Sequence, residues 1–217
     1  MLNKTNISAI RTEYEMGQLN ESEVAEDPID QFRRWFDEAL ERRVMEPNAM
    51  TLATVSAAGR PSSRVVLLKE LSEAGFGFFS NYHSRKGREL GENPYASALF
   101  FWPELQRQVR IVGRTAKMSS KLSDAYFSSR PRASQLGAIV SPQSQAITNR
   151  NVLDDALAAI QQGYHDSDVL PRPAHWGGYW LVPDEMEFWQ GRSSRLHDRL
   201  LYKKQADSRW TIGRLAP

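Results

Sequence analysis

The densest group of potentially reactive side chains lies beyond the middle of the chain. Tyr126 and Arg130 are four residues apart, which places both on one face of a helix. A proline then opens a new turn beside Ser134. A phenol, a guanidinium and a hydroxyl can bind a phosphate together, because arginine gives forked, charge-assisted hydrogen bonds. Gln143 and Ser144 add a polar loop cluster, so the whole group has more anion-binding capacity than one phosphate requires, although each residue alone could be a cap or turn residue.

A second group begins a predicted short helix. Ser84 is a natural N-cap, so Arg85 and Lys86 fall in the first helical turn, where the helix dipole disfavours cations. An anion at the helix start would explain the pair, because free N–H groups there bind phosphate. A solvated pair that costs roughly a few tenths of a kcal/mol explains it equally well. The sequence leaves both explanations open.

The strand RVVLLK carries a cation at each end. Arg64 and Lys69 have opposite parity, so alternation predicts that they leave the strand on different faces, with an apolar run typical of a buried strand between them. For a strand taken alone, two ends that emerge into solvent are the simpler explanation.

A fourth group lies near the C-terminus. If residues 195–199 form a strand, then Arg195, His197 and Arg199 share one face and make a good ligand wall. Asp198 points the other way, toward a neighbouring cation. The ring of Trp189 could border a planar cofactor, although a buried aromatic ring more often serves packing. An exposed edge strand protected by charges against aggregation is a real alternative.

The elements that must position these groups are mostly short strands, which predict a mainly β fold, a barrel or sandwich with peripheral helices. Residues 1–27 are expected to form a mobile N-terminal arm and residues 28–217 a single domain. Helices are predicted at residues 28–44, 84–94, 119–130, 132–140 and 149–165. Strands are predicted at residues 50–71 (a hairpin turning at Ala58-Gly59), 75–82, 95–102, 105–118, 177–183, 185–191, 196–204 and 208–215.

Composition excludes several classes of protein. The 217 residues are 41% apolar and 25% charged, as in a soluble globular protein, and a net charge of +2 is too small to indicate a nucleic-acid binder. No apolar run could span a membrane, the first 20 residues lack a secretory signal, and zero Cys excludes disulfides and thiolate metal sites. The four His have no metal-ligand spacing, and Gly-rich dinucleotide, Walker and GxSxG motifs are missing. We expect a cytoplasmic protein without bound metal.

The motifs together closely resemble one known family, the pyridoxamine 5′-phosphate oxidases. The resemblance extends from Arg11 to Pro217 and rests on RVVLLK, SRKGREL, YFSSRPRASQLGAIVSPQSQ, FWQGRSSRLHDR and the terminal RLAP. It implies a split β-barrel homodimer that holds FMN at the subunit interface. The implied reaction oxidises C4′ of pyridoxine or pyridoxamine 5′-phosphate to give pyridoxal 5′-phosphate, with hydride passing to the flavin and dioxygen then yielding hydrogen peroxide.

The resemblance also assigns residues by position. Those matching FMN contacts are Arg64, Val65, Val66, Leu67, Phe79, Ser80, Arg85, Lys86, Gln108, Gln143, Ser144, Trp189 and Arg199. Those matching the grip on the substrate phosphate are Lys69, Tyr126, Arg130 and Ser134. Arg195 and His197 match the catalytic pair beside the pyridine ring, and Arg11 to Tyr14 match a segment that covers the substrate. The chain departs from its relatives at Arg192-Ser193-Ser194, which adds a cation near the site.

Two other functions remain as alternatives. A split-barrel flavin reductase with another substrate would keep Arg64, Lys86 and Ser144 but would not need the four substrate-phosphate residues, all of which are present. A non-enzymatic carrier of FMN or pyridoxal phosphate would bind without turnover. The oxidase is therefore the first hypothesis, with two phosphorylated ligands bound at once, one on each side of the strand that carries Arg64 and Lys69.

Overall fold

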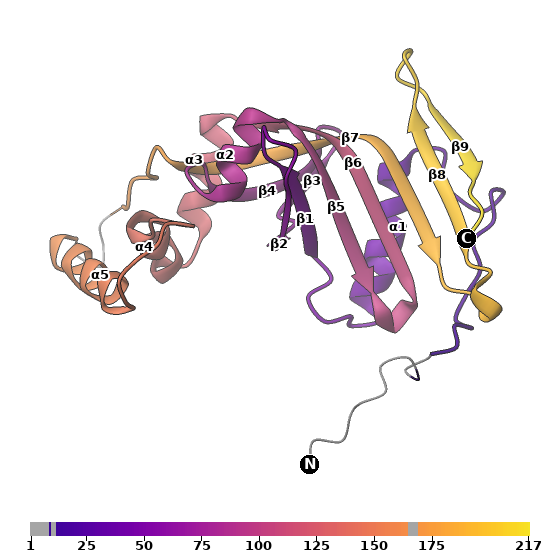
Figure 1. Cartoon of the computed structure of the whole chain (residues 1–217), viewed down its shortest axis with the longest axis horizontal. Coiled ribbons are helices and arrows are strands. Elements are labelled where there is room, and N and C mark those ends of the chain that lie inside the picture. Colours follow the sequence, from indigo (N-terminus) through magenta and orange to yellow (C-terminus); the bar gives the residue numbers. More distant parts are fainter. Residues whose placement is uncertain (1–8, 10–11, 165–168) are drawn as a thin grey trace. The chain divides into compact units, whose positions relative to one another are not determined.

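The computed structural model describes residues 9, 12–164 and 169–217 (Figure 1). Nine strands and several helices alternate along this part of the chain, so the mainly β fold with peripheral helices is confirmed. The elements in chain order are α1 (Pro28–Glu41), β1 (Ala49–Val55), β2 (Pro61–Leu67), β3 (Glu70–Ser72), β4 (Gly75–Asn81), α2 (Arg85–Glu92), β5 (Tyr95–Trp102), η2 (Pro103–Leu105), β6 (Arg107–Lys117), α3 (Ser120–Ser129), α4 (Arg132–Val140), α5 (Asn151–Gly163), β7 (Trp176–Gln190), η3 (Ser193–Arg195), β8 (Asp198–Lys204) and β9 (Trp210–Arg214).

The chain divides into two compact units. Unit 1 comprises residues 1–47, 99–111 and 185–217, and unit 2 comprises residues 48–98 and 112–184. The strands follow the order β2-β1-β5-β6-β7-β4-β3, and β8 pairs with both β7 and β9. Strands β5, β6 and β7 each begin in one unit and end in the other.

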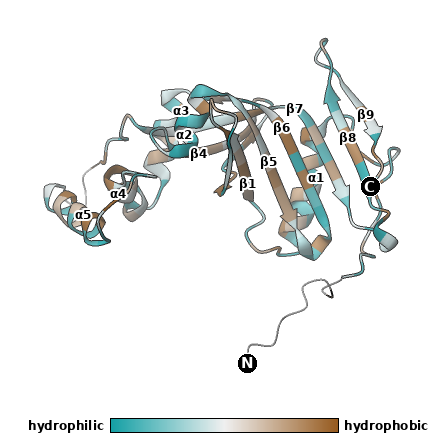
Figure 2. Cartoon of the chain, viewed as in Figure 1, coloured by the Kyte–Doolittle hydropathy of each residue, from teal (hydrophilic) through white to brown (hydrophobic). Residues whose placement is uncertain are grey.

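The core of unit 1 forms around α1, as the apolar spacing after Pro28 predicts. Asp27 caps the helix by accepting a hydrogen bond from the Ile29 N–H. Phe32 and Trp35 are buried, and their rings lie 4.9 Å from Phe100 and 5.3 Å from Phe188, respectively. Figure 2 shows hydrophobic residues along α1 and the strands beside it. This aromatic packing fixes α1 on its part of the sheet.

Unit 2 contains the predicted hairpin. Strands β1 and β2 pair antiparallel from Ala49↔Leu67 to Val55↔Pro61. The turn between them contains Gly59 at φ +75°, a left-handed conformation that glycine adopts without steric cost. Strand β4 pairs with β3 and with the first part of β7.

Strand β2 differs from its prediction in two ways. It ends at Leu67, so Lys69 lies beyond the strand. Strand alternation therefore does not determine the side on which Lys69 lies relative to Arg64. The strand is also not buried, since Val65 is 64% exposed and Leu67 38% exposed. Strand β2 lies at the end of the strand order, where it is hydrogen-bonded to β1.

The two strands predicted at residues 177–183 and 185–191 are one continuous strand, β7. Its first part pairs with β4 and its last part, from Glu185, pairs with β8. Pro183 lies between these two paired stretches, where its missing N–H disrupts neither ladder. The proline therefore does not end the strand.

No helix in the described part of the chain has both the length and the apolar composition needed to cross a bilayer. The same residues contain no group of three or more His, Asp or Glu side chains placed to hold a metal ion.

Candidate functional site

Unit 2 contains a cavity of about 290 Å³ that gathers most of the residues predicted there. Strands β2 and β4 and helices α2 and α3 supply much of its lining, and the loop after α4 supplies Gln143. The lining residues are Val65, Val66, Leu67, Lys69, Phe79, Ser80, Asn81, Lys86, Tyr126, Arg130, Gln143 and Trp176. Lys69 is among them even though it lies outside β2. Asn81 and Trp176 were not predicted.

Lys86 brings a buried positive charge to this cavity. Ser84 caps α2 as expected, which places Lys86 in the first turn with 9% of its surface exposed. Its Nζ donates to Ser80 Oγ at 3.1 Å and to Gln143 Oε1 at 3.2 Å, and both acceptors are neutral. Burial, followed by the charge of Arg64, lowers the pKa of Lys86. A buried ammonium held only by neutral groups is suited to bind an anionic ligand.

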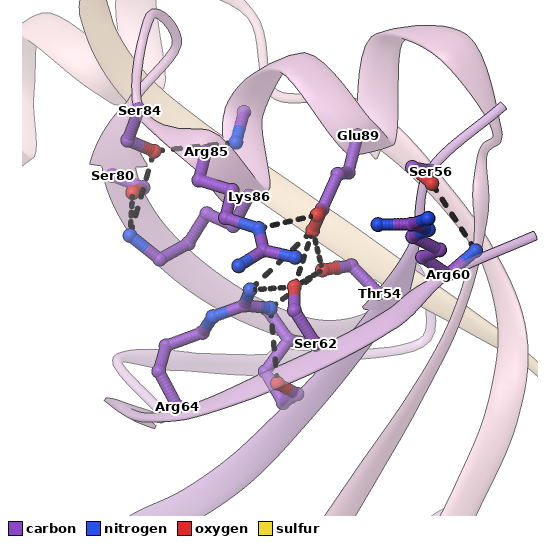
Figure 3. A network of polar contacts seen from close by, with 12 residues as sticks. Thr54, Ser56, Arg60, Ser62, Arg64, Ser80, Ser84, Arg85, Lys86 and Glu89 are labelled. Carbon is purple, nitrogen blue, oxygen red and sulfur yellow. Dashed lines mark hydrogen bonds and ion pairs between the residues drawn. The ribbon is translucent and has the colours of Figure 1, made fainter. Parts of the chain in front are cut away.

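A polar network around Glu89 organises the neighbouring arginines (Figure 3). Glu89 is 4% exposed and accepts hydrogen bonds from Thr54 Oγ1 at 2.5 Å, Ser62 Oγ at 2.6 Å and Arg85 Nε at 2.8 Å. Arg64 Nη2 lies 3.4 Å from the same carboxylate, and its Nη1 donates to Thr54 Oγ1 at 2.6 Å. Glu89 therefore fixes the guanidinium groups of both predicted arginines.

Glu89 stays ionised in this environment. Burial alone would raise its pKa, but hydrogen bonds from Ser62, Thr54 and Arg85 outweigh burial and lower the pKa to about 2. Arg64, Arg85 and Lys86 carry three positive charges against the one negative charge of Glu89, and this net charge of +2 matches the charge of about −2 on a phosphomonoester. The sequence analysis missed Glu89, although its position four residues after Arg85 in a helix could have indicated the pairing.

The aromatic wall of the cavity carries a second cation, Arg130. The rings of Tyr126 and Phe79 stack at 3.8 Å, and the Arg130 guanidinium lies 4.7 Å from the centre of the Trp176 ring. Arg130 Nη1 is buried and has no hydrogen-bond partner in the described part of the chain. Burial lowers the pKa of Arg130 and raises that of Tyr126. An unpartnered buried guanidinium nitrogen is a second position suited to an anion.

Arg130 does not continue the helix that carries Tyr126. Helix α3 ends at Ser129, and Arg130 caps it with φ −71° and ψ 149°. The following Pro131 disfavours helical backbone at the residue before it, which explains the early end. The expected helical i, i+4 pair is therefore wrong, but both side chains still line one cavity.

Ser134 lies beside an adjoining cavity of about 330 Å³ in the same unit. Arg130, Gln143 and Trp176 line this cavity as well as the first one. The Ser134 N–H donates to Pro131 O at 2.8 Å within the first turn of α4. Arg64, Arg85 and Ser144 are the predicted members of unit 2 that line neither cavity.

Unit 1 contains a larger cavity, of about 600 Å³. The residues that line it come from the N-terminal segment and from the loop before β8: Thr12, Glu13, Tyr14, Arg192, Ser194, Arg195 and His197. Tyr14, Arg195 and His197 are thus brought together as the resemblance implies. Arg11 lies outside the described residues.

Residues 195–197 are not part of a strand, which corrects the prediction of a shared strand face. Strand β8 begins at Asp198, and Ser193–Arg195 form a 3₁₀ turn that the Leu196 N–H closes by bonding to Ser193 O at 3.1 Å. Ser194 and Arg195 have φ values of 55° and 60°, which an extended strand does not permit. The turn, rather than strand alternation, brings Arg195 and His197 to one cavity.

The ring of His197 contacts the backbone of Arg192 and two aromatic rings. The Arg192 N–H donates to His197 Nδ1 at 3.1 Å. The neutral ring therefore carries its proton on Nε2. Burial, then the charge of Arg195, lowers the pKa of His197, so the ring is neutral at pH 7. The rings of Trp189 and Tyr14 lie 4.6 Å and 5.7 Å from it.

His197 also borders a third cavity, of about 290 Å³, which contains the other predicted residues of unit 1: Gln108, Trp189 and Arg199. Arg199 Nε donates to Glu187 Oε1 at 2.8 Å, and this bond raises the pKa of Arg199. Arg110 pairs with the same carboxylate. The sequence analysis missed Glu187, whose partner Arg110 is 77 residues away in β6 and whose partner Arg199 lies in the next strand, β8.

Comparison with known proteins identifies the family. The family described as pyridoxamine 5′-phosphate oxidase matches residues 36–163, and the pyridoxine 5′-phosphate oxidase C-terminal dimerisation region matches residues 176–217. A Cupriavidus pinatubonensis protein named pyridoxine/pyridoxamine 5′-phosphate oxidase is 54% identical over 98% of this chain and 100% of its own length. The chain belongs to the pyridoxamine 5′-phosphate oxidase family, and this membership supports an oxidoreductase of that type.

Solved structures agree with this fold. PhzG from Burkholderia lata, crystallised with tetrahydrophenazine-1-carboxylic acid, is 35% identical with a TM-score of 0.85, covering 92% of this chain and 98% of PhzG. An FMN-binding protein related to pyridoxamine 5′-phosphate oxidase from Nostoc punctiforme has a TM-score of 0.69 at 20% identity, covering 86% of this chain and 97% of its own. These matches confirm the split β-barrel, and the dimerisation region supports the predicted homodimer.

Proposed function

We propose that this protein is a cytoplasmic, FMN-dependent oxidase that converts pyridoxine and pyridoxamine 5′-phosphate to pyridoxal 5′-phosphate. The observation that carries the proposal is the cavity of unit 2, which contains buried Lys86, held only by neutral acceptors, and Arg130, whose buried Nη1 has no hydrogen-bond partner in the described part of the chain. Two separate anion positions beside an aromatic wall fit two phosphorylated ring compounds. The names of the relatives support the same reaction.

The residues of unit 2 fit the phosphate of FMN around Lys86. In the proposal, Lys86 and Ser80 bind this phosphate, while Glu89 holds Arg64 and Arg85 in place. Exposed Val65 and Leu67 offer an apolar surface to a flavin ring. FMN, when bound, supplies the hydride acceptor that dioxygen restores.

The substrate phosphate is assigned to the second cation. Arg130 Nη1 is free to donate to it, and Lys69 and Tyr126 line the same cavity, with Ser134 in the adjoining one. Fixing the phosphates of both ligands orients them relative to each other, which converts an encounter into a unimolecular step.

The residues of unit 1 are assigned to the reacting ring. Because Nδ1 of His197 already accepts the Arg192 N–H, its Nε2–H is the atom left to donate to a substituent at C4′. Arg195 lines the same cavity and supplies a positive charge beside the pyridine ring. Gln108, Trp189 and Arg199 are assigned to the flavin, at the interface of the homodimer. The mobile arm at residues 1–27 and the single domain at residues 28–217 stay predictions.

The likeness to PhzG favours a second candidate, a flavin enzyme that oxidises a polycyclic carboxylic acid. Such a substrate would leave the substrate-phosphate residues without a role. The buried, unpartnered nitrogen of Arg130 therefore favours the phosphorylated substrate.

The test is an aerobic reaction of the FMN-loaded protein with pyridoxine phosphate, with hydrogen peroxide and aldehyde both measured. We expect equal amounts of the two products, and Arg130→Gln should raise KM for pyridoxine phosphate while leaving any oxidation of unphosphorylated pyridoxine unchanged. Tight binding without peroxide would instead indicate a carrier. Turnover of tetrahydrophenazine-1-carboxylic acid but not of pyridoxine phosphate would support the second candidate.

A further inference from the structure

One carboxylate in unit 1, Asp198, connects three segments that are far apart in the sequence. Its Oδ2 accepts hydrogen bonds from the Leu19 N–H and from Arg192 Nη1, both at 3.0 Å. Its Oδ1 accepts a hydrogen bond from Arg214 Nη1 at 2.7 Å. The N-terminal segment, the loop before β8 and strand β9 therefore meet at a single side chain that is 15% exposed.

Arg214 strengthens the attachment of the N-terminal segment. Its Nη2 donates to Leu19 O at 2.8 Å, and its Nε and Nη2 bind the two carboxylate oxygens of Glu21 at 2.9 Å and 2.7 Å. Leu19 itself is buried. The side chain of Arg214 thus bridges Asp198 to both the backbone and a side chain of the segment.

The attached segment brings the ring of Tyr14 beside His197. Five residues before Leu19, the ring of Tyr14 lies 5.7 Å from His197 and 5.8 Å from Trp189. The backbone N–H groups of Glu15 and Met16 donate to Gln106 Oε1 at 2.9 Å and 3.1 Å, but these contacts are exposed. Leu19 is the first buried anchor after Tyr14.

The second partner of Asp198, Arg192, contacts His197 directly. Arg192 lies in the loop before β8, and its N–H donates to His197 Nδ1. The ion pair between its side chain and Asp198 fixes the residue whose backbone sets the proton position on the ring. Tyr14 and Arg192, which both line the cavity beside His197, are therefore both connected to the carboxylate of Asp198.

We propose that Asp198 is a positioning residue, which holds Tyr14 over His197 through Leu19 and Arg214 and holds the ring of His197 through Arg192. Asp198 itself does not line the His197 cavity. Its predicted effect on turnover rests on the proposed function, whereas its effect on the N-terminal segment does not.

The first test compares Asp198→Ala with the wild-type protein by hydrogen exchange. We expect residues 12–21 to exchange at least tenfold faster in the variant, while β7 and α1 stay as protected as in the wild type. Asp207→Asn is the matched control, because Asp207 is an exposed aspartate of the same unit that pairs with Arg209. Unchanged exchange at residues 12–21, or an equal increase throughout unit 1, would overturn the proposal.

The second test separates positioning from a merely structural role. With pyridoxine phosphate, Asp198→Ala should raise KM and lower kcat, about tenfold each, while FMN affinity stays within twofold of the wild type. The KM and kcat of Asp198→Asn should lie between those of the wild type and Asp198→Ala. Its amide oxygen still accepts a hydrogen bond from the Leu19 N–H but pairs poorly with two arginines. A loss of FMN affinity that parallels the loss of turnover would contradict positioning.

Arg214→Gln serves if Asp198→Ala does not fold, since it removes the contacts of Arg214 with Leu19 O and Glu21 from an exposed side chain. It should release residues 12–21 while leaving the Arg192 contact in place, so KM should change more than kcat. If the wild-type protein does not oxidise pyridoxine phosphate, the proposed function fails, and hydrogen exchange still decides the role of Asp198.

Discussion

The cavities of the two units use their cations in different ways. In unit 2, Lys86 contacts neutral acceptors and Arg130 has a nitrogen without a partner in the described part of the chain. In unit 1, Arg192 and Arg199 are each paired with a carboxylate. Burying a charge is costly unless it is paired, so an unpaired buried cation marks the place of an anionic ligand, whereas a paired cation holds the framework. The comparison predicts that unit 2 determines affinity and unit 1 determines turnover.

The largest expected effect is on turnover, from Arg195→Ala in unit 1. Removing the charge and fork of Arg195 leaves the pyridine ring poorly oriented, and misplacement of about 1 Å can cost about 100-fold in rate. We expect kcat to fall by about this factor, with FMN affinity unchanged, as measured by steady-state kinetics and flavin titration. Arg209→Ala, at an exposed arginine of the same unit, is the control. An unchanged kcat would defeat the assignment of Arg195.

The next largest effect is expected on FMN affinity rather than on turnover, from Lys86→Met in unit 2. A hydrogen bond to a charged group contributes about 1.5–3 kcal/mol, so the Kd for FMN should rise about 10- to 100-fold. Turnover at saturating FMN should change little. Flavin fluorescence measures the Kd, and Lys117→Met is the control because Lys117 lies over the Tyr82 ring. A large fall in kcat with FMN affinity intact would break the division between the units.

A smaller effect is expected from pH, through His197. Its pKa lies below the ordinary value of 6.5, so the ring is neutral at pH 7. As the pH falls through that pKa, Nδ1 gains a proton and no longer accepts the Arg192 N–H. We expect kcat/KM to fall up to tenfold per pH unit below the pKa of His197. His197→Asn should remove this acid limb, and a variant that keeps it would show that another group is responsible.

The smallest effect concerns a helix cap. Ser84→Ala removes the oxygen that accepts the Gly87 N–H at the start of α2, which costs about 1 kcal/mol and lowers Tm by about 2–4 °C. Because this cap also positions Lys86, FMN binding should weaken. Ser119→Ala removes the equivalent cap of α3 and should lower Tm similarly without changing FMN affinity. Equal effects of both variants on FMN affinity would show that the cap of α2 has no special role.

Much of the fold could be predicted from local patterns. The spacing of apolar residues predicted α1, and Ser84 predicted the start of α2. The hairpin of β1 and β2 followed from alternation and a glycine turn. Each of these signals depends on residues within a few positions of one another, which is why the sequence alone contains them.

The two errors have different physical causes. Pro183 does not end β7, because the partner of β7 changes from β4 to β8 around this residue. Arg195 and His197 do not share a strand face because a turn with positive φ precedes β8. At Pro183, pairing with distant strands outweighed the tendency of proline to end a strand. At Arg195, the local backbone conformation outweighed the alternating pattern of the residues.

The residue types and motifs by themselves determined the family, the main elements and the set of side chains available to bind anions. Only the tertiary structure decided which of those charges are neutralised. Glu187 pairs with Arg110 of β6, 77 residues away, and Asp198 binds the backbone of Leu19, 179 residues away. No local pattern in the sequence could indicate these two contacts. Whether a buried cation is paired with a carboxylate or is left to bind a ligand depends on contacts that form only when the chain folds.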